Sequence, residues 1–281
     1  MRSNTTEAKN PISLHVFVIS WRNQHEKAEI IEAAVAPMAE KTTVIFTEPD
    51  AVSAKHPHWH QVPDEYYYGM KHKVALELHA SSTPNSVFIE IQADNISDEW
   101  AALVERARFV FTNNPNVGMY SPRVDGVMWT TNRCRIGPTS SAGLVPATVA
   151  DPSWWAIHPA IAASTSKVDH TKNNFGWGIG WHVSMQVLAR GYSVLKDENY
   201  KIIQPAGTGY AQDEAKRQYA EFLENLTIRE TLLLKSSRKL FSTRNPKRKN
   251  SKNALRAKVW VRIIQLQLLP GRLLRVAGVY R

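Results

Sequence analysis

The feature that most constrains the fold is a strand–helix–strand alternation near the start of the chain. Residues 14–20 are a β-branched and apolar run that predicts a buried strand, and residues 42–49 are a second predicted strand. Between them, residues 25–40 carry apolar side chains at helical spacing, with acids in the first turn. Such a βαβ unit normally belongs to a parallel sheet that is covered by helices on both faces.

The alternation continues along the chain and predicts one large domain. We expect further strands at residues 86–92, 117–124 and 192–203, and further helices at residues 70–79, 97–113, 182–191 and 212–226. Ser97 is a good N-cap residue for the second of these helices. An irregular polar region at residues 125–150 interrupts the pattern. The sequence therefore predicts an α/β domain over residues 12–227, preceded by a flexible N-terminus at residues 1–11.

Composition excludes several classes of protein. Among the 281 residues, 43% are hydrophobic and 21% are charged, which is typical of a globular chain and not of a disordered one. A single cysteine, Cys134, excludes an intrachain disulfide and a metal cage built from cysteines. No apolar run approaches the roughly 18 residues of a spanning helix, and no secretory signal is recognisable. We therefore expect a cytoplasmic protein.

The positive charge is concentrated in the last fifth of the chain. Residues 228–281 contain 15 Lys and Arg against one acid, Glu230, so the net charge of +10 divides into +14 there and −4 over residues 1–227. We expect a basic helical extension, with a helix over residues 254–269 that ends at Pro270. It is too polar to span a bilayer but suits a membrane interface. A solvated tail and a nucleic-acid-binding tail are the alternatives, and the acidic domain argues against nucleic acid.

Two segments follow predicted strands at the edge where parallel α/β sheets bind ligands. The first runs from Ser20 through Trp21 to Arg22, and the second contains Asp94. An aspartate at a strand end suits Mg²⁺ or Mn²⁺ in a diphosphate site, because these cations prefer oxygen ligands. The alternative is that Asp94 only begins a turn. Lys71 is a further candidate for contacting phosphate groups.

A loop rich in glycine and aromatic residues precedes the predicted helix at residues 182–191. It spans residues 173–181 and combines Phe175, Trp177 and Trp181 with several glycines. Flat aromatic faces suit stacking on sugar or base rings, and the glycines give access to the backbone. The alternative is a tryptophan-lined corner of the core.

Over residues 12–223 the chain resembles glycosyltransferases of the GT-A fold, of the family 2-like kind. The resemblance rests on four matches: the strand ending in Ser20 and Trp21, the helix start at residues 68–71, the segment 88–94 with Trp100 soon after, and the segment 175–179. It implies a Rossmann-like GT-A domain with a central, mostly parallel sheet flanked by helices. It also implies a nucleotide-sugar donor and bound Mn²⁺ or Mg²⁺.

The resemblance also assigns roles to individual residues. It gives the metal to Asp94 and the donor to the set Ser20, Trp21, Arg22, Glu48, Lys71, Gln92 and Asp94, and it gives the sugar or acceptor to the set Trp177, Gly178 and Trp181. Related sequences commonly carry an acid where this chain has Gly180, so His182 is the expected base and Asp151 the alternative. Gln92 and Gln204 also stand where relatives have an acid and a histidine.

The sequence thus predicts a glycosyltransferase that extends a glycan or lipid-linked acceptor in cell-surface polysaccharide synthesis. We expect it at the inner face of the cell membrane, held peripherally by the basic extension. Gln92, Gly180 and Gln204 favour a second hypothesis, a catalytically degenerate protein that binds a sugar nucleotide or a glycan. A nucleic-acid-binding protein that uses its basic tail is a third reading.

Overall fold

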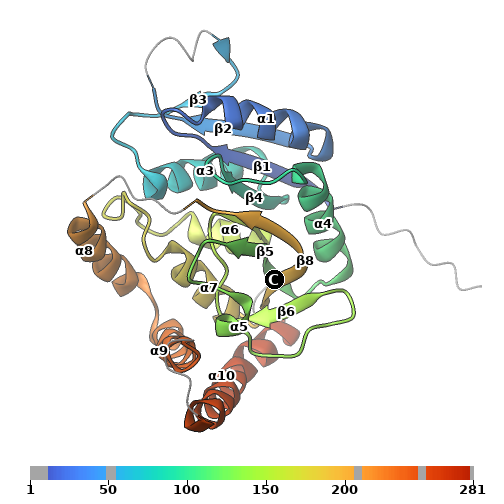
Figure 1. Cartoon of the computed structure of the whole chain (residues 1–281), viewed down its shortest axis with the longest axis vertical. Coiled ribbons are helices and arrows are strands. Elements are labelled where there is room, and N and C mark those ends of the chain that lie inside the picture. Colours follow the sequence, from blue (N-terminus) through green and yellow to red (C-terminus); the bar gives the residue numbers. More distant parts are fainter. Residues whose placement is uncertain (1–11, 49–54, 206–210, 246–250, 279–281) are drawn as a thin grey trace, which may run out of the picture.

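A computed structural model describes residues 12–48, 55–205, 211–245 and 251–278, and the expected flexible N-terminus lies outside these residues. Eight strands form one sheet in the order β3-β2-β1-β4-β7-β5-β8-β6 (Figure 1). The strands are β1 (Leu14–Ile19), β2 (Lys41–Phe46), β3 (His60–Gln61), β4 (Val87–Gln92), β5 (Val117–Asp125), β6 (Leu144–Ala147), β7 (Trp154–Ile157) and β8 (Ser193–Ile203).

Helices follow most of the strands. They are α1 (His25–Val35), α3 (Tyr68–Ser82), α4 (Trp100–Asn113), α5 (Thr131–Cys134), α6 (Pro159–Thr165), α7 (Ile179–Ala189), α8 (Gln212–Phe222), α9 (Ile228–Thr243) and α10 (Ser251–Val276). Short 3₁₀ turns, Ala36–Met38 and Leu223–Asn225, extend α1 and α8. The predicted strands at 14–20, 42–49, 86–92, 117–124 and 192–203 are all present. Their ends lie within one residue of those expected, except that β2 ends at Phe46, three residues early.

The sheet is mostly parallel, as predicted, but two strands run the other way. β3, β2, β1 and β4 are mutually parallel, and β5 is parallel to β8. β7 is antiparallel to both of its neighbours, β4 and β5, and β6 is antiparallel to β8 at the edge. Because β7 runs opposite to β4, the amino end of β7 lies at the carboxyl end of β4.

Helices cover both faces of the sheet. Along β1, Val16 and Val18 point to the face that α1 and α4 cover, whereas Phe17 and Ile19 point to the face of α3, α6 and α7. This alternation follows from the period of two in a strand. Both faces are buried, which explains why the strands read as continuous apolar runs.

Three details of the expected elements were wrong. α4 begins at Trp100, and Ser97 does not cap it, because its hydroxyl accepts the backbone N–H of Glu99 at 3.1 Å instead. The region 125–150 is not wholly irregular, since it contains α5 and β6. The C-terminal helix does not end at Pro270 but continues to Val276.

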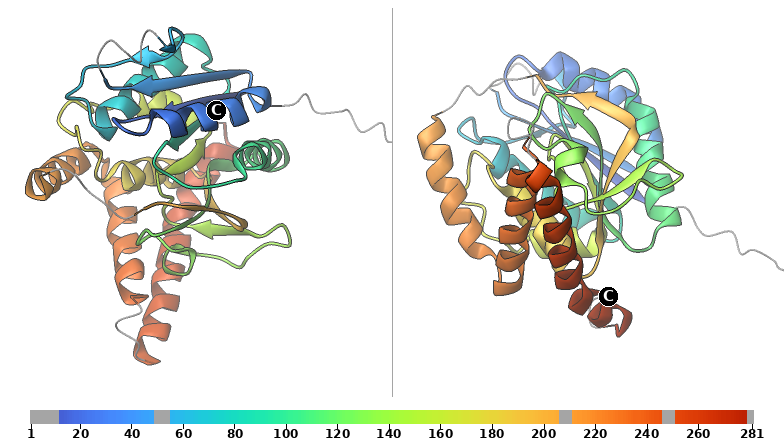
Figure 2. Two further views of the ribbon diagram at one scale, coloured as in Figure 1. Left: turned by 45° about the horizontal axis from the view of Figure 1, so that its top comes forward. Right: turned by 60° about the horizontal axis from the view of Figure 1, so that its bottom comes forward.

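The C-terminal helices pack onto the domain as a hairpin. α9 begins with a capping box in which the Thr227 hydroxyl and the Glu230 carboxylate each bond the other's backbone, and it buries Leu233 and Leu240. α9 lies against α7, and α10 lies against α9, so the two long helices run side by side (Figure 2). Arg275 holds the last turn of α10 through bonds to Asn116 Oδ1 and the Pro115 carbonyl, each 2.6 Å long. These contacts hold the part of α10 that follows Pro270 against the domain.

Among the helices of the described residues, none is both long enough and apolar enough to cross a membrane.

Candidate functional site

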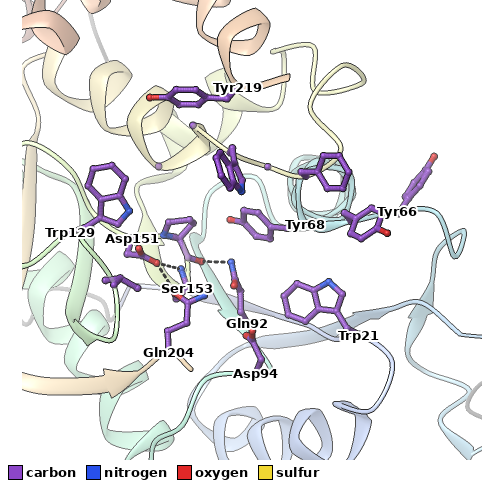
Figure 3. A pocket seen from close by; sticks show the side chains of 18 of the residues that line it. Trp21, Tyr66, Tyr68, Gln92, Asp94, Trp129, Asp151, Ser153, Gln204 and Tyr219 are labelled. Carbon is purple, nitrogen blue, oxygen red and sulfur yellow. Dashed lines mark hydrogen bonds between the residues drawn. The ribbon is translucent and has the colours of Figure 1, made fainter. Parts of the chain in front are cut away.

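Three strand ends converge at one edge of the sheet. Ile91 of β4 pairs with Trp154 of β7, and the next residue, Gln92, donates its backbone N–H to the Ser153 carbonyl at 2.9 Å. A bridge between Ile96 and Ile203 brings the end of β8 to the same place. The polar residues that meet there are Gln92, Asp94, Asp151, Ser153 and Gln204 (Figure 3).

These polar residues line a cavity of about 1310 Å³. Its walls come from the segment after β1, the end of β2, the turn before α3, the segments before α5 and β7, the glycine-rich loop and α8. Nine of the lining residues are aromatic: Trp21, Tyr66, Tyr67, Tyr68, Trp129, Phe175, Trp177, Trp181 and Tyr219. Figure 3 shows the carboxylates and amides between Trp129 on one side and Trp21 and Tyr66 on the other. A few polar groups inside an aromatic wall are typical of a ligand site.

Asp94 lines this cavity from just beyond the end of β4. Its Oδ1 atom is buried and has no hydrogen-bond partner among the described residues. Burial raises the pKa of Asp94 above its ordinary value, because water no longer stabilises the charged form. A buried carboxylate oxygen without a partner calls for a cation or a donor from a ligand.

Asp151 lines the same cavity and is held rigidly. Its Oδ1 accepts the backbone N–H of Ser153 at 2.9 Å and also the Ser153 hydroxyl. Burial raises the pKa of Asp151, and the bonds from Ser153 oppose that rise. The Ser153 hydroxyl also lies 2.5 Å from Gln204 Oε1, so the three side chains form one polar group. A raised pKa makes an oriented carboxylate a stronger proton acceptor than an ordinary aspartate.

His182, the expected base, lies elsewhere. It is fully buried in α7, is absent from the cavity wall, and its ring lies 4.8 Å from that of Phe222. Neither ring nitrogen has a partner among the described residues, and burial lowers the pKa of His182 to about 4. The structure thus brings Asp151, and not His182, to the cavity.

Gly180 also lines the cavity, and its lack of a side chain has a packing reason. A Cβ atom there would lie 3.0 Å from the Ala150 carbonyl oxygen and 3.2 Å from Pro152 Cδ. The segment before β7 therefore occupies the space that a side chain at position 180 would need. The same segment supplies Asp151. The carboxylate in this part of the cavity therefore comes from the segment before β7 and not from the glycine-rich loop that contains Gly180.

The residues expected at the donor divide into two groups. Trp21, Arg22, Gln92 and Asp94 line the cavity, with Arg22 paired to Asp64. Ser20, Glu48 and Lys71 do not line it. The Ser20 hydroxyl and Glu48 Oε2 each lie 2.9 Å from a ring nitrogen of His25.

Lys71 lies directly behind the cavity wall. Its buried ammonium donates to the Ser20 carbonyl at 2.6 Å and to Thr47 Oγ1 at 3.1 Å, and it lies 5.0 Å from the centre of the Trp21 ring. Burial lowers the pKa of Lys71 to about 7. Lys71 therefore ties the ends of β1 and β2 together and supports the Trp21 ring.

The expected sugar or acceptor residues Trp177, Gly178 and Trp181 all line the cavity. Gly178 has a φ of 88°, and a Cβ atom there would lie 2.6 Å from a ring carbon of Tyr219. Only glycine fits both this left-handed conformation and this close approach. The glycine-rich loop thereby packs against α8.

Sequence reasoning missed several residues of the wall, notably Tyr66, Tyr68, Trp129, Ser153 and Tyr219. The run of three tyrosines at positions 66–68 was a signal for the first two. Tyr68 donates its hydroxyl to Glu90 Oε1 at 2.6 Å, and His72 Nδ1 lies 2.6 Å from the other oxygen of that carboxylate. Ser153 had no such signal, because its place depends on the reversed path of β7. Trp129 is placed by rings distant in sequence, those of Trp181 and Phe241.

No cluster of three or more His, Cys, Asp or Glu residues within the described ranges can hold a metal ion by itself. Asp94 nevertheless offers one unpartnered carboxylate oxygen in the cavity. Mg²⁺ is commonly bound by one or two carboxylates together with substrate phosphates. The residues present thus fit a cation that is shared with a bound diphosphate, and not a cage made by the protein alone.

Comparisons with known proteins support the fold. No family model and no curated protein matches the chain. Among solved structures, a crystal structure of GalNAc-T7 with UDP, GalNAc and Mn²⁺ superposes with a TM-score of 0.58 at 9% identity, covering 97% of this chain. This chain spans 58% of the length of that one. The expected GT-A fold, with its mostly parallel sheet between helices, is thereby confirmed.

A second solved structure, a CMP:2-keto-3-deoxy-manno-octonic acid synthetase complexed with CTP, has a TM-score of 0.44 at 7% identity. The superposition covers 76% of this chain and 100% of the synthetase chain. This score is too low to indicate a shared fold.

Proposed function

We propose that this chain is a glycosyltransferase that moves a sugar from a nucleotide-sugar donor to a hydroxyl of a glycan or lipid-linked acceptor. The observation that carries the proposal is the convergence of Asp94 and Asp151 in one aromatic-walled cavity at the strand ends of a GT-A fold. In open α/β sheets, ligands bind at this edge.

Asp151 acts as the general base in this proposal. Two hydrogen bonds from Ser153 orient its carboxylate. Burial raises the pKa of Asp151, which makes the carboxylate a stronger base. It takes the proton of the acceptor hydroxyl while that oxygen attacks the anomeric carbon and the nucleoside diphosphate leaves. Proton transfer of this kind typically contributes a factor of about 10² to 10⁴ in rate.

Asp94 binds the donor side. Together with the amide of Gln92 it would hold Mn²⁺ or Mg²⁺ against the diphosphate, and such a cation neutralises the charge that develops on the leaving group. Trp21 and Arg22 contact the nucleotide, because a ring and a cation suit a base and a phosphate. Trp177 and Trp181, which also line the cavity, hold the sugar or the acceptor.

The biological setting that fits these residues is the synthesis of a cell-surface polysaccharide at the cytoplasmic face of the cell membrane. A basic extension of net charge +14 supports a peripheral location on anionic lipid.

Turnover of a panel of nucleotide sugars, with free nucleoside diphosphate as the readout, tests the proposal. We expect one donor to be consumed in the presence of Mn²⁺, and Asp151→Asn to lower kcat by about 100-fold or more. Asp98→Asn is the matched control, because Asp98 is exposed and lies outside the cavity. Equal losses in both variants, or none in Asp151→Asn, would remove Asp151 from the role of base.

A second candidate function is a degenerate GT-A-like protein that binds a sugar nucleotide or glycan without transferring it. Gln92, Gly180 and Gln204 favour it, because they leave the cavity with fewer acids and no histidine on its wall. A donor that raises the melting temperature but is not consumed with any acceptor would support this function over the first.

A further inference from the structure

α10 has two apolar faces on opposite sides of the helix. One face carries Ala257, Ile264, Leu268 and Gly271, which are buried. The other face has no partner among the described residues. A helix that is apolar on two sides shows no single apolar stripe in its sequence.

The outer face is a continuous stripe of exposed side chains. Leu255, Leu266 and Leu273 are 68%, 65% and 69% exposed, and Val259 and Leu269 are about half exposed. With Arg262, these residues recur at alternating intervals of four and three, which places them in one line along the helix. We call this set the outer stripe. Exposed leucines in a contiguous line indicate a surface that binds a partner.

The charges within the outer stripe and beside it on α10 are all positive. Exposed Arg256, Lys258, Arg262 and Arg272 make no ion pair with any described residue, and α10 contains no acid over its 26 residues. The neighbouring α9 adds Lys235, Arg238 and Lys239 with Glu230 as its one acid. The partner of the stripe must therefore accept leucine side chains and positive charge together.

We propose that the outer stripe of α10 is a docking surface for an anionic lipid bilayer. A helix lying in the interface buries its leucines at the level of the upper acyl chains while its Lys and Arg side chains meet lipid phosphates. A second copy of this chain fits less well, because it would bring two uniformly positive surfaces together. Nucleic acid would meet the charges but would leave the leucines exposed to water.

The way α10 is held suits this role. Its inner face and Arg275 already fix it on the domain, so docking does not have to order the helix first. The hairpin also reaches the cavity, since the Phe241 ring of α9 lies 5.0 Å from Trp129 and 6.3 Å from Trp181. The hairpin that would bind the bilayer therefore also packs against two residues of the cavity wall. This inference goes beyond the proposed transfer reaction and does not depend on it.

Flotation of the full chain with vesicles tests the proposal. We expect it to float with vesicles of phosphatidylglycerol and phosphatidylcholine, but not with phosphatidylcholine alone. Leu266→Asp with Leu273→Asp should lower the floated fraction about tenfold or more, because two acids repel the anionic surface and remove the apolar contact. Ile30→Asp on α1 is the matched control, since Ile30 is 63% exposed and lies far along the chain from α10.

Each other outcome has a defined meaning. Failure of the unaltered chain to float with anionic vesicles would overturn the proposal, as would equal flotation of the double variant with an unchanged melting temperature. A dimer in light scattering that the double variant converts to a monomer would instead assign the stripe to a second copy. Loss of flotation in Ile30→Asp as well would show that the effect is one of net charge and not of the stripe.

Discussion

Single residues in the cavity owe their chemistry to burial. Asp94 and Asp151 lie where water is largely excluded, and burial raises the pKa of both carboxyl groups. Only Asp151 has strong local donors, and Ser153 supplies both. Because these bonds favour the charged form, they limit the rise in the pKa of Asp151.

This balance predicts the pH dependence of the reaction. A base whose pKa is raised keeps its proton to higher pH, so activity should fall on the acid side at a pH above the ordinary value for aspartate, which is about 4. Ser153→Ala removes the hydroxyl bond to the carboxylate and keeps the backbone one, so the acid limb of kcat/KM should move to still higher pH. Asp98→Asn should leave the limb in place. A limb that moves down in Ser153→Ala would contradict the assignment.

At the scale of elements, the path of β7 decides where the site forms. The ends of β1, β2 and β4 border the cavity, and the sequence predicted all three strands because apolar runs mark buried strands. It did not predict that β7 runs antiparallel between β4 and β5. A short apolar segment such as that around Trp154 and Trp155 carries no information on the direction of a strand. Asp94 could therefore be placed from sequence, whereas the choice of Asp151 over His182 could not.

The basic extension shows the same limit. The charge of residues 228–281 predicted a basic extension. The spacing of Thr227 and Glu230 is that of a capping box and marks the start of α9. α10 continues past Pro270 because contacts distant in sequence, such as that of Arg275 with Asn116, hold its last turn. Local propensity could not supply that information.

α9 should therefore behave as an integral part of the domain. Leu240 is fully buried in the core shared with α7, whereas Leu232 on the same helix is half exposed. Leu240→Ala should lower the free energy of unfolding by about 3 kcal/mol through lost burial and a cavity. Leu232→Ala should change it by less than about 0.5 kcal/mol. Equal small effects in chemical denaturation would show that α9 is not packed as described.

At the scale of the whole molecule, several elements bury histidines in neutral form. Burial lowers the pKa of His15 on β1 and of His170 to about 3, and that of His182 on α7 to about 4. The unfolded chain protonates these imidazoles below about pH 6.5, while the folded protein does not. The folded state is therefore fully favoured above that pH, and this stability is lost as the pH falls toward 4.

Denaturation at a series of pH values measures this loss. We expect the free energy of unfolding to fall by up to about 1.4 kcal/mol per pH unit for each such histidine. His182→Leu should make the slope between pH 6 and pH 4.5 shallower by about one such increment. His58→Leu is the control, because His58 is exposed and pairs with Glu32 at the surface. An unchanged slope in His182→Leu would mean that His182 is not buried as described.

The cavity connects the scales of residue, element and molecule, because strand ends from distant parts of the chain must meet for Asp94 and Asp151 to share it. The most direct measurement is the melting temperature of the chain with nucleoside diphosphates and nucleotide sugars, in Mn²⁺ and in EDTA. A ligand that binds only the folded state at about 100 times its Kd stabilises it by about 2.7 kcal/mol, which is a shift of a few degrees. We expect such a shift for one nucleotide in Mn²⁺, reduced by EDTA and by Asp94→Asn but not by Asp98→Asn. Equal melting temperatures across the whole panel would contradict the assignment of this cavity to a nucleotide sugar.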